Sequence, residues 1–153
     1  MSAFRLGLAA KRGAAMELHL GRLIDHVHIR VADVARSKAF YRAALAPLGR
    51  DLIRDTEHYF TADELFVSGA EGGPISKIHL AFQAASPEMV QAFHAAALSA
   101  GGTNNGDPGA RDYHPGYYGA FVRDPDGNNI EAVFHGPSTR SAASVKVTAE
   151  MLD

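Results

Sequence analysis

The chain has 153 residues, a length that fits one domain or two small similar halves. Fifteen Lys and Arg against seventeen Asp and Glu give a net charge of −2, so the protein offers no basic field to attract a nucleic-acid backbone. Hydrophobic residues make up 46% of the chain, yet no stretch approaches the roughly 20 apolar residues that span a bilayer. We therefore expect a globular protein without nucleic-acid or membrane partners.

Two further features limit the kinds of site and the location that we expect. The sequence has no cysteine, which excludes disulfides, thiolate zinc sites, iron–sulfur clusters and a cysteine nucleophile. Any metal site must use His, Asp or Glu, and eight His are available. The first 20 residues contain no apolar run of signal-peptide length, so we expect a cytoplasmic protein.

The chain repeats itself once. A shift of 53 positions places His26 on His79. The match continues without a gap, with Phe40 on Phe93 and Gly49 on Gly102. Each half therefore begins with a strand headed by a histidine and continues into a helix. We expect an extension over 1–21, one domain over 22–136 built from modules at about 23–69 and 77–135, and a tail over 137–153.

Both predicted helices have clear start and stop signals. Asp33 can cap the first helix, which Pro47 and Gly49 end. Ser86 can cap the second, with Pro87 in its first turn. Apolar residues recur at helical spacing along both segments, so each helix should pack on a sheet.

Short strand signals follow each helix. They cover 51–54, 58–60 and 65–67 in the first half, and 119–122 and 129–134 in the second. The Asp124-Pro-Asp-Gly127 segment predicts a hairpin turn between the last two strands. We thus expect two βαβββ units, and a surface loop over 104–116 that rims a pocket.

Strand alternation predicts where the polar residues point. Val27, Ile29 and Val31 should face the helix, so His26 should face away from it. The same alternation places His79 and Glu131 on the corresponding face of the second half. If an approximate two-fold axis relates the halves, the two imidazoles and the carboxylate converge and can bind a divalent ion. The alternative is that the two histidines form buried polar pairs.

Three segments carry a family resemblance: Asp25 to Tyr41 (DHVHIRVADVARSKAFY), Lys77 to Phe82 (KIHLAF) and Tyr117 to Val133 (YYGAFVRDPDGNNIEAV). They resemble the vicinal-oxygen-chelate superfamily, which includes glyoxalase I, fosfomycin-resistance enzymes, extradiol dioxygenases and bleomycin-binding proteins. The resemblance implies an α+β fold in which paired βαβββ modules form an incomplete barrel. It also implies one divalent metal ion (Zn, Ni, Mn or Fe).

The resemblance further implies the ligands of that ion. They would be His26, His79 and Glu131, with Glu131 also serving as the catalytic carboxylate. Glyoxalase I uses a fourth ligand, an acid on the last strand of the first module. One alignment of the halves puts Glu64 at that position and another puts Phe66 there, leaving two histidines and one glutamate.

The leading hypothesis is a metal-dependent enzyme that acts on a small oxygen-rich molecule, with the ion as a Lewis acid. Four ligands would favour glyoxalase-like lyase or isomerase chemistry, and three would favour ring-cleaving dioxygenase or transferase chemistry. The alternatives are a metal-free drug-binding protein of the bleomycin-resistance type and a small interaction domain. Candidate substrate-binding residues are His28, Phe66, and Tyr117 or Tyr118. The resemblance and the open sheet edges together imply a homodimer.

Overall fold

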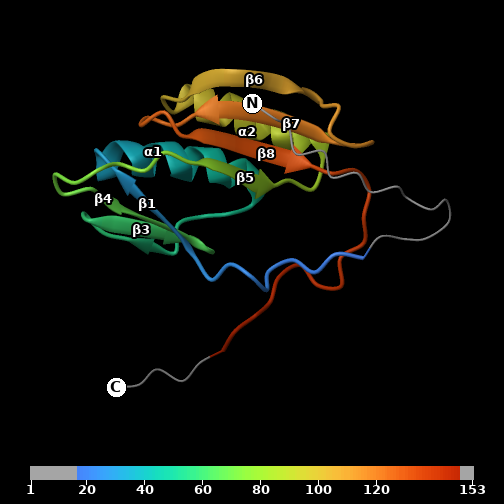
Figure 1. Ribbon diagram of the computed structural model, residues 1–153, viewed down its shortest axis with the longest axis horizontal. Helices are drawn as coiled ribbons and strands as arrows, with labels where there is room; N and C mark the ends of the chain where they lie inside the picture. Colours follow the sequence, from blue (N-terminus) through green and yellow to red (C-terminus); the bar gives the residue numbers. More distant parts are fainter. Residues whose placement is uncertain (1–16, 149–153) are drawn as a thin grey trace. The chain divides into compact units, whose positions relative to one another are not determined.

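The computed structural model describes residues 17–148 (Figure 1). The chain divides into two units. One unit covers His26–Ser138, and the other consists of the two chain ends. The described parts of the ends contain no helix or strand. Most of the expected extension over 1–21 and the last residues of the tail lie outside the described residues. In the part of the chain that is described, no helix is long and apolar enough to cross a bilayer.

The unit at 26–138 contains two βαβββ modules, as the repeat predicts. The first module contains β1 (Val27–Val31), α1 (Val34–Leu45), the short 3₁₀ helix η1 (Ala46–Leu48), β2 (Arg54–Asp55), β3 (Tyr59–Ala62) and β4 (Leu65–Gly69). The second contains β5 (His79–Gln83), α2 (Pro87–Ser99), β6 (Thr103–Ala110), β7 (Tyr118–Arg123) and β8 (Asn129–Phe134). The strand orders are β1-β4-β3-β2 and β5-β8-β7-β6, so the fold is α+β with two open sheets.

The helix signals in the sequence correspond to real caps. Asp33 accepts a hydrogen bond from the backbone N–H of Arg36 at 2.9 Å, and Ser86 accepts one from Met89 at 3.3 Å. Beyond η1 the chain turns at Gly49, whose φ of 74° is a left-handed conformation that glycine adopts without strain. These signals fix where each helix leaves its sheet.

The two modules share one hydrophobic core. In Figure 1, α1 lies between the strands of the two sheets, and α2, which packs on β6, β7 and β8, also packs against α1. Phe40 on α1 and Phe93 on α2 are fully buried in the same cluster as Ile29 and Ile130 from the two sheets. A Cβ at Gly102 would approach the Phe40 ring to 2.8 Å, so glycine permits this close contact between the modules. Each sheet therefore turns its helix-covered face toward the other module and its opposite face outward.

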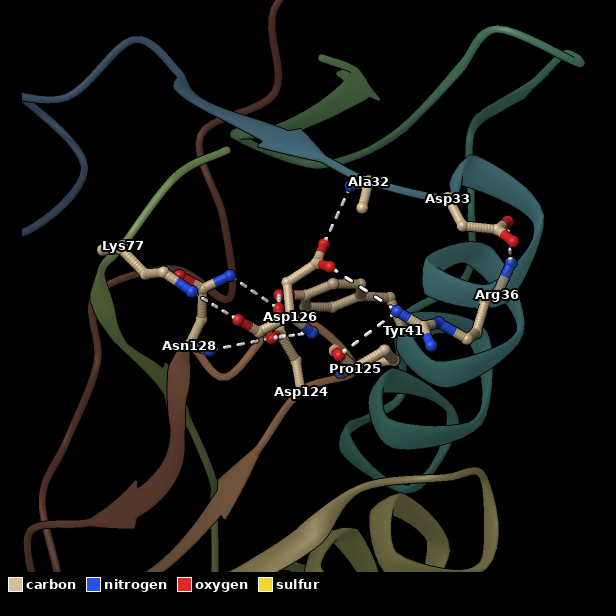
Figure 2. A network of polar contacts seen from close by, with 9 residues as sticks. All are labelled: Ala32, Asp33, Arg36, Tyr41, Lys77, Asp124, Pro125, Asp126 and Asn128. Atoms are coloured by element: carbon tan, nitrogen blue, oxygen red, sulfur yellow. Dashed lines mark hydrogen bonds and ion pairs between the residues drawn. The ribbon is translucent and has the colours of Figure 1, made fainter. Parts of the chain in front are cut away.

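A buried polar network joins the modules at the hairpin turn between β7 and β8 (Figure 2). Asp124 is 4% exposed, and its Oδ2 accepts hydrogen bonds from the Tyr41 hydroxyl at 2.7 Å and from Asn128 Nδ2 at 2.9 Å. Its Oδ1 accepts from the backbone N–H groups of Asp126 and Asn128. Burial, followed by the charge of Asp124, raises the pKa of Tyr41 well above its ordinary range, so the phenol keeps its proton and donates.

The same turn also holds the first strand of each module. The Asp126 carboxylate accepts from the backbone N–H of Ala32, directly after β1, at 3.1 Å. Asn128 Oδ1 accepts from the backbone N–H of Ile78, just before β5, at 2.9 Å. The predicted hairpin turn is thus also the clamp that fixes one module against the other.

One sequence expectation is wrong. Most of the segment 104–116, expected as a surface loop, belongs to the edge strand β6, and only 111–117 connects β6 to β7. The Gly, Asn and Pro residues that suggested a loop are accommodated because the pairing of β6 with β7 shifts register around Gly106.

Replacing Tyr41 with Phe should lower the free energy of unfolding by about 1–3 kcal/mol, because the buried Asp124 carboxylate loses a donor. Urea unfolding measures the change. Tyr113→Phe is the matched control, since Tyr113 is 68% exposed, and it should leave stability nearly unchanged. Equal stability of the Tyr41 variant and the parent would contradict the role of this network.

Candidate metal and substrate site

Glu131 lies in the middle of the outward face of the second sheet. It lies on β8 between Ala81 of β5 and Phe121 of β7, and its side chain is 3% exposed. His79 Nε2 lies 2.9 Å from Oε2, and the Tyr117 hydroxyl donates to Oε1. A buried carboxylate is tolerated when both oxygens are hydrogen-bonded, and here both are.

A glycine gives Tyr117 access to Glu131. Gly119 and Phe121 share the outward face of β7, and the side chain of Tyr117, directly before the strand, passes over Gly119. A Cβ at Gly119 would lie 3.1 Å from Glu131 Oε1 and 3.2 Å from Tyr117 Cε1. Burial, then the hydrogen bond to Glu131, raises the pKa of Tyr117 well above its usual range. Tyr117 therefore remains a proton donor to one oxygen and leaves the other oxygen to His79.

Aromatic rings hold Tyr117 in place. Its ring makes edge contacts with Tyr113, His114 and His135, at centroid distances of 4.9, 5.3 and 5.2 Å. His114 Nδ1 donates to the Pro115 carbonyl at 2.9 Å, and its Nε2 shares a hydrogen bond with His135 Nδ1 at 2.8 Å. Burial, followed by the neighbouring His114, lowers the pKa of His135. The lowered pKa favours the neutral form of His135 beside the site.

The outward face of the first sheet carries a different set of side chains. His28 and Phe66, both expected to bind substrate, lie together with ring centroids 4.5 Å apart, and Tyr59 is 5.4 Å from Phe66. His28 Nε2 is 2.8 Å from the Ser68 hydroxyl. This face is aromatic, whereas the face around Glu131 carries the acid.

Tyr118 lies on the helix-covered side of the second sheet. It packs against the core, and its hydroxyl accepts a hydrogen bond from Gln91 on α2 at 2.9 Å. Tyr117, the other tyrosine considered from the sequence, is the one beside Glu131. Strand alternation carries this signal, because 117, 119, 121 and the opposing Glu131 share one face.

The strand register identifies the counterpart of Glu131 in the first module. The 53-residue repeat places His28 on Ala81. Ala81 pairs with Glu131 in β8, and His28 pairs with Phe66 in β4. Phe66 therefore occupies the position equivalent to Glu131. Glu64 is exposed and lies two residues earlier, before β4 begins.

His79 and Glu131 fit two ligands of one divalent ion. Their facing donor atoms are 2.9 Å apart, and two ligands about 2.1 Å from an ion at right angles to each other are about 3 Å apart. His26 directly precedes β1, on the other sheet. Within residues 17–148 of one chain, no group of three or more His, Cys, Asp or Glu is placed to hold a metal ion. One chain thus brings together His79 and Glu131 but does not add His26.

Comparison with known proteins identifies the family of this fold. The model of the Glyoxalase/Bleomycin resistance protein/Dioxygenase superfamily matches residues 23–132. No curated protein sequence gives a significant match. A solved glyoxalase/bleomycin resistance protein from Albidiferax ferrireducens T118 is 35% identical, with 72% of this chain and 96% of that one covered at a TM-score of 0.60.

Two more distant structures share the fold. The lactoylglutathione lyase from Agrobacterium tumefaciens is 16% identical, with 73% of this chain and 92% of that one covered at a TM-score of 0.55. A glyoxalase/bleomycin resistance protein/dioxygenase family enzyme from Burkholderia phytofirmans PsJN is 21% identical, with 71% and 95% covered at a TM-score of 0.58. From its fold and its match over 23–132, the chain belongs to the glyoxalase/bleomycin resistance protein/dioxygenase superfamily.

Proposed function

We propose that the protein is a divalent-metal-dependent enzyme that acts on a small molecule with vicinal oxygens. The observation that carries the proposal is the nearly buried Glu131 carboxylate, held on the outward face of β8 with His79 Nε2 at 2.9 Å. A bound divalent ion would act there as a Lewis acid toward the substrate oxygens. The family match supports this chemistry because the superfamily includes metal-dependent glyoxalases and dioxygenases.

The third ligand in this proposal is His26 of a second copy of the chain. The strands β1 and β5 each form an edge of their sheet, and edge strands can pair with another chain. On β1 the backbone of Arg30 already bonds to Ser76, so the start of the strand is the part that a second copy would reach. If β1 of one copy lay beside β5 of the other, the two sheets would continue each other. The His26 at the start of β1 would then approach His79 and Glu131, and the protein would function as a homodimer.

In that dimer the aromatic face of one copy would stand beside the acidic face of the other. His28 and Phe66 would form one wall of the pocket, and Tyr117 would border Glu131. Tyr117 donates to Oε1 of Glu131, so Oε2, which faces His79 Nε2, is the oxygen that would bind the ion or accept a proton from the substrate. Glu131 would therefore be the catalytic carboxylate.

The strand register favours one reaction class. Phe66 stands where a fourth ligand would be, which leaves two histidines and one carboxylate. Such a set is typical of iron-dependent oxygenases with open coordination positions. We therefore place ring-cleaving oxygenation, or a transferase of the fosfomycin-resistance type, ahead of glyoxalase-like isomerisation.

A metal-free binding protein is the second candidate. It is favoured by the hydrogen bonds that satisfy Glu131 through His79 and Tyr117 without any ion. Metal analysis of protein purified without added ions separates the candidates. Stoichiometric metal supports the enzyme, and metal-free protein that binds an aromatic ligand tightly supports the binding protein.

Replacing His79 with Ala should weaken divalent-ion binding by at least about 100-fold, because a direct ligand is lost. Calorimetric titration with Zn²⁺ or Ni²⁺ measures the affinity. His58→Ala is the matched control, since His58 is exposed in the turn before β3, and it should bind the ion as the parent does. His94 is less suitable because it is 8% exposed and bonded to Asn104 at 2.9 Å.

Glu64→Gln in the same titration checks the ligand count. We expect the parent affinity, because the register assigns the fourth position to Phe66. A large loss in this variant would place Glu64 in the ligand set. Unchanged binding by the His79 variant would contradict the metal site itself.

A further inference from the structure

Arg111 lies beside the Glu131 site, in the connection between β6 and β7. Its guanidinium carbon is 5.4 Å from the centre of the Phe121 ring, in a cation–π contact. Phe121 is the direct cross-strand partner of Glu131, and its ring centroid is 6.0 Å from that of His79. The positive charge of Arg111 is therefore one aromatic ring away from the two proposed ligands.

The surrounding backbone is shaped to hold this arginine. Its Nη2 donates to the Asp107 carbonyl at 2.7 Å, and its Nη1 donates to the Ala110 carbonyl at 3.2 Å. A Cβ at Gly109 would lie 3.1 Å from Nη1, and one at Gly106 would lie 2.9 Å from the Phe121 ring. The two glycines of the irregular strand β6 thus leave the space in which the guanidinium and the ring stack.

Arg111 shares with Arg30 and Arg123 the property that its hydrogen bonds go to backbone carbonyls, and unlike them it stacks on a ring beside Glu131. Arg36, Arg42 and Arg50 each form an ion pair with an aspartate. Among the ion pairs within residues 17–148, none involves Arg111. The oxygens of the nearby Glu131 bond to His79 and Tyr117, and none of the ion pairs within 17–148 joins Glu131 to Arg111.

A half-buried guanidinium without a carboxylate partner favours an anionic ligand. Arginine has five N–H donors in a planar fork that matches the oxygens of a carboxylate or phosphate, and two backbone carbonyls occupy only part of that set. The stack on Phe121 and the bonds to its own loop hold the fork in one orientation, which reduces the entropy lost on binding.

We propose that Arg111 binds an oxyanion group of the substrate, so that the substrate class is a small molecule with vicinal oxygens and a carboxylate or phosphate. This inference rests on the proposed function, because it takes the site around Glu131 to be the substrate site. Arg111 would fix the anionic end of the molecule over Phe121, and the vicinal oxygens would then point toward His79 and Glu131.

The test uses three probes that share a vicinal diol: glycerate, glycerol 3-phosphate and neutral glycerol. Each is titrated into the full chain, with and without Zn²⁺, and binding is followed in NMR spectra by the backbone amide resonances of Phe121 and Glu131, and in the parent also by the Arg111 Nε–Hε resonance. The Arg111 resonance should respond to at least one anion at a concentration at least about tenfold lower than to glycerol. Whether glycerate or glycerol 3-phosphate gives the stronger response identifies the anion.

Three variants make the test specific. Arg111→Gln removes the charge, and Gly109→Ala keeps the charge but places a methyl group against the guanidinium. Both should lose the preference for anions while keeping the parent's Zn²⁺ affinity. Arg123→Gln is the control, because Arg123 lies on the same strand as Phe121 but bonds to the Gly127 carbonyl of the hairpin. This variant should keep the preference.

The inference would be overturned if glycerol bound as well as the anions, if the Arg111→Gln variant kept the preference, or if only the Arg123 variant lost it. Zn²⁺ binding without an anion preference would refute the role of Arg111 and leave the metal site standing. An anion response at Arg111 in a protein that binds no metal would refute the proposed enzyme and support the oxyanion site.

Discussion

The buried carboxylate of Asp124 is the constraint on which the arrangement of the two modules depends. It accepts hydrogen bonds from Tyr41 of the first module and from Asn128 and two backbone groups of its own turn. A buried carboxylate is costly unless such donors surround it, and Tyr41 can supply its hydrogen bond only when α1 lies against the β7–β8 turn. The network therefore stabilises one orientation of the modules, in which α1 lies against the β7–β8 turn (Figure 2).

That orientation has a direct consequence for function. The helices cover one face of each sheet, so the candidate site residues lie on the outward faces: His28 and Phe66 on one, His79 and Glu131 on the other. The Asp124 network that joins the modules thus keeps His28 and Phe66 away from Glu131 within one chain. In our proposal a second copy reunites them across the edges formed by β1 and β5, which makes the dimer part of the active site.

Much of this could be predicted from the sequence. The 53-residue repeat gives two modules, Asp33 and Ser86 give the helix starts, and strand alternation puts His79 and Glu131 on one face. Local patterns do not show which faces of the two modules pack together, because that depends on long-range contacts such as the hydrogen bond from Tyr41 to Asp124. For the same reason the sequence suggested that His26 and His79 converge within one chain. Arg111 went unnoticed because the Gly and Pro residues around it resemble a surface loop.

Mixing two inactive variants tests the central claim of a site shared between chains. His26→Ala and His79→Ala are each expected to lose tight Zn²⁺ binding. Unfolded and refolded together, they should form mixed dimers in which one site contains both native histidines. Random pairing would restore roughly one quarter of the parent's sites, measured by calorimetry. If the mixture binds no more Zn²⁺ than either variant alone while the parent binds it, the ligands belong to one chain or His26 is not among them, and the account is contradicted.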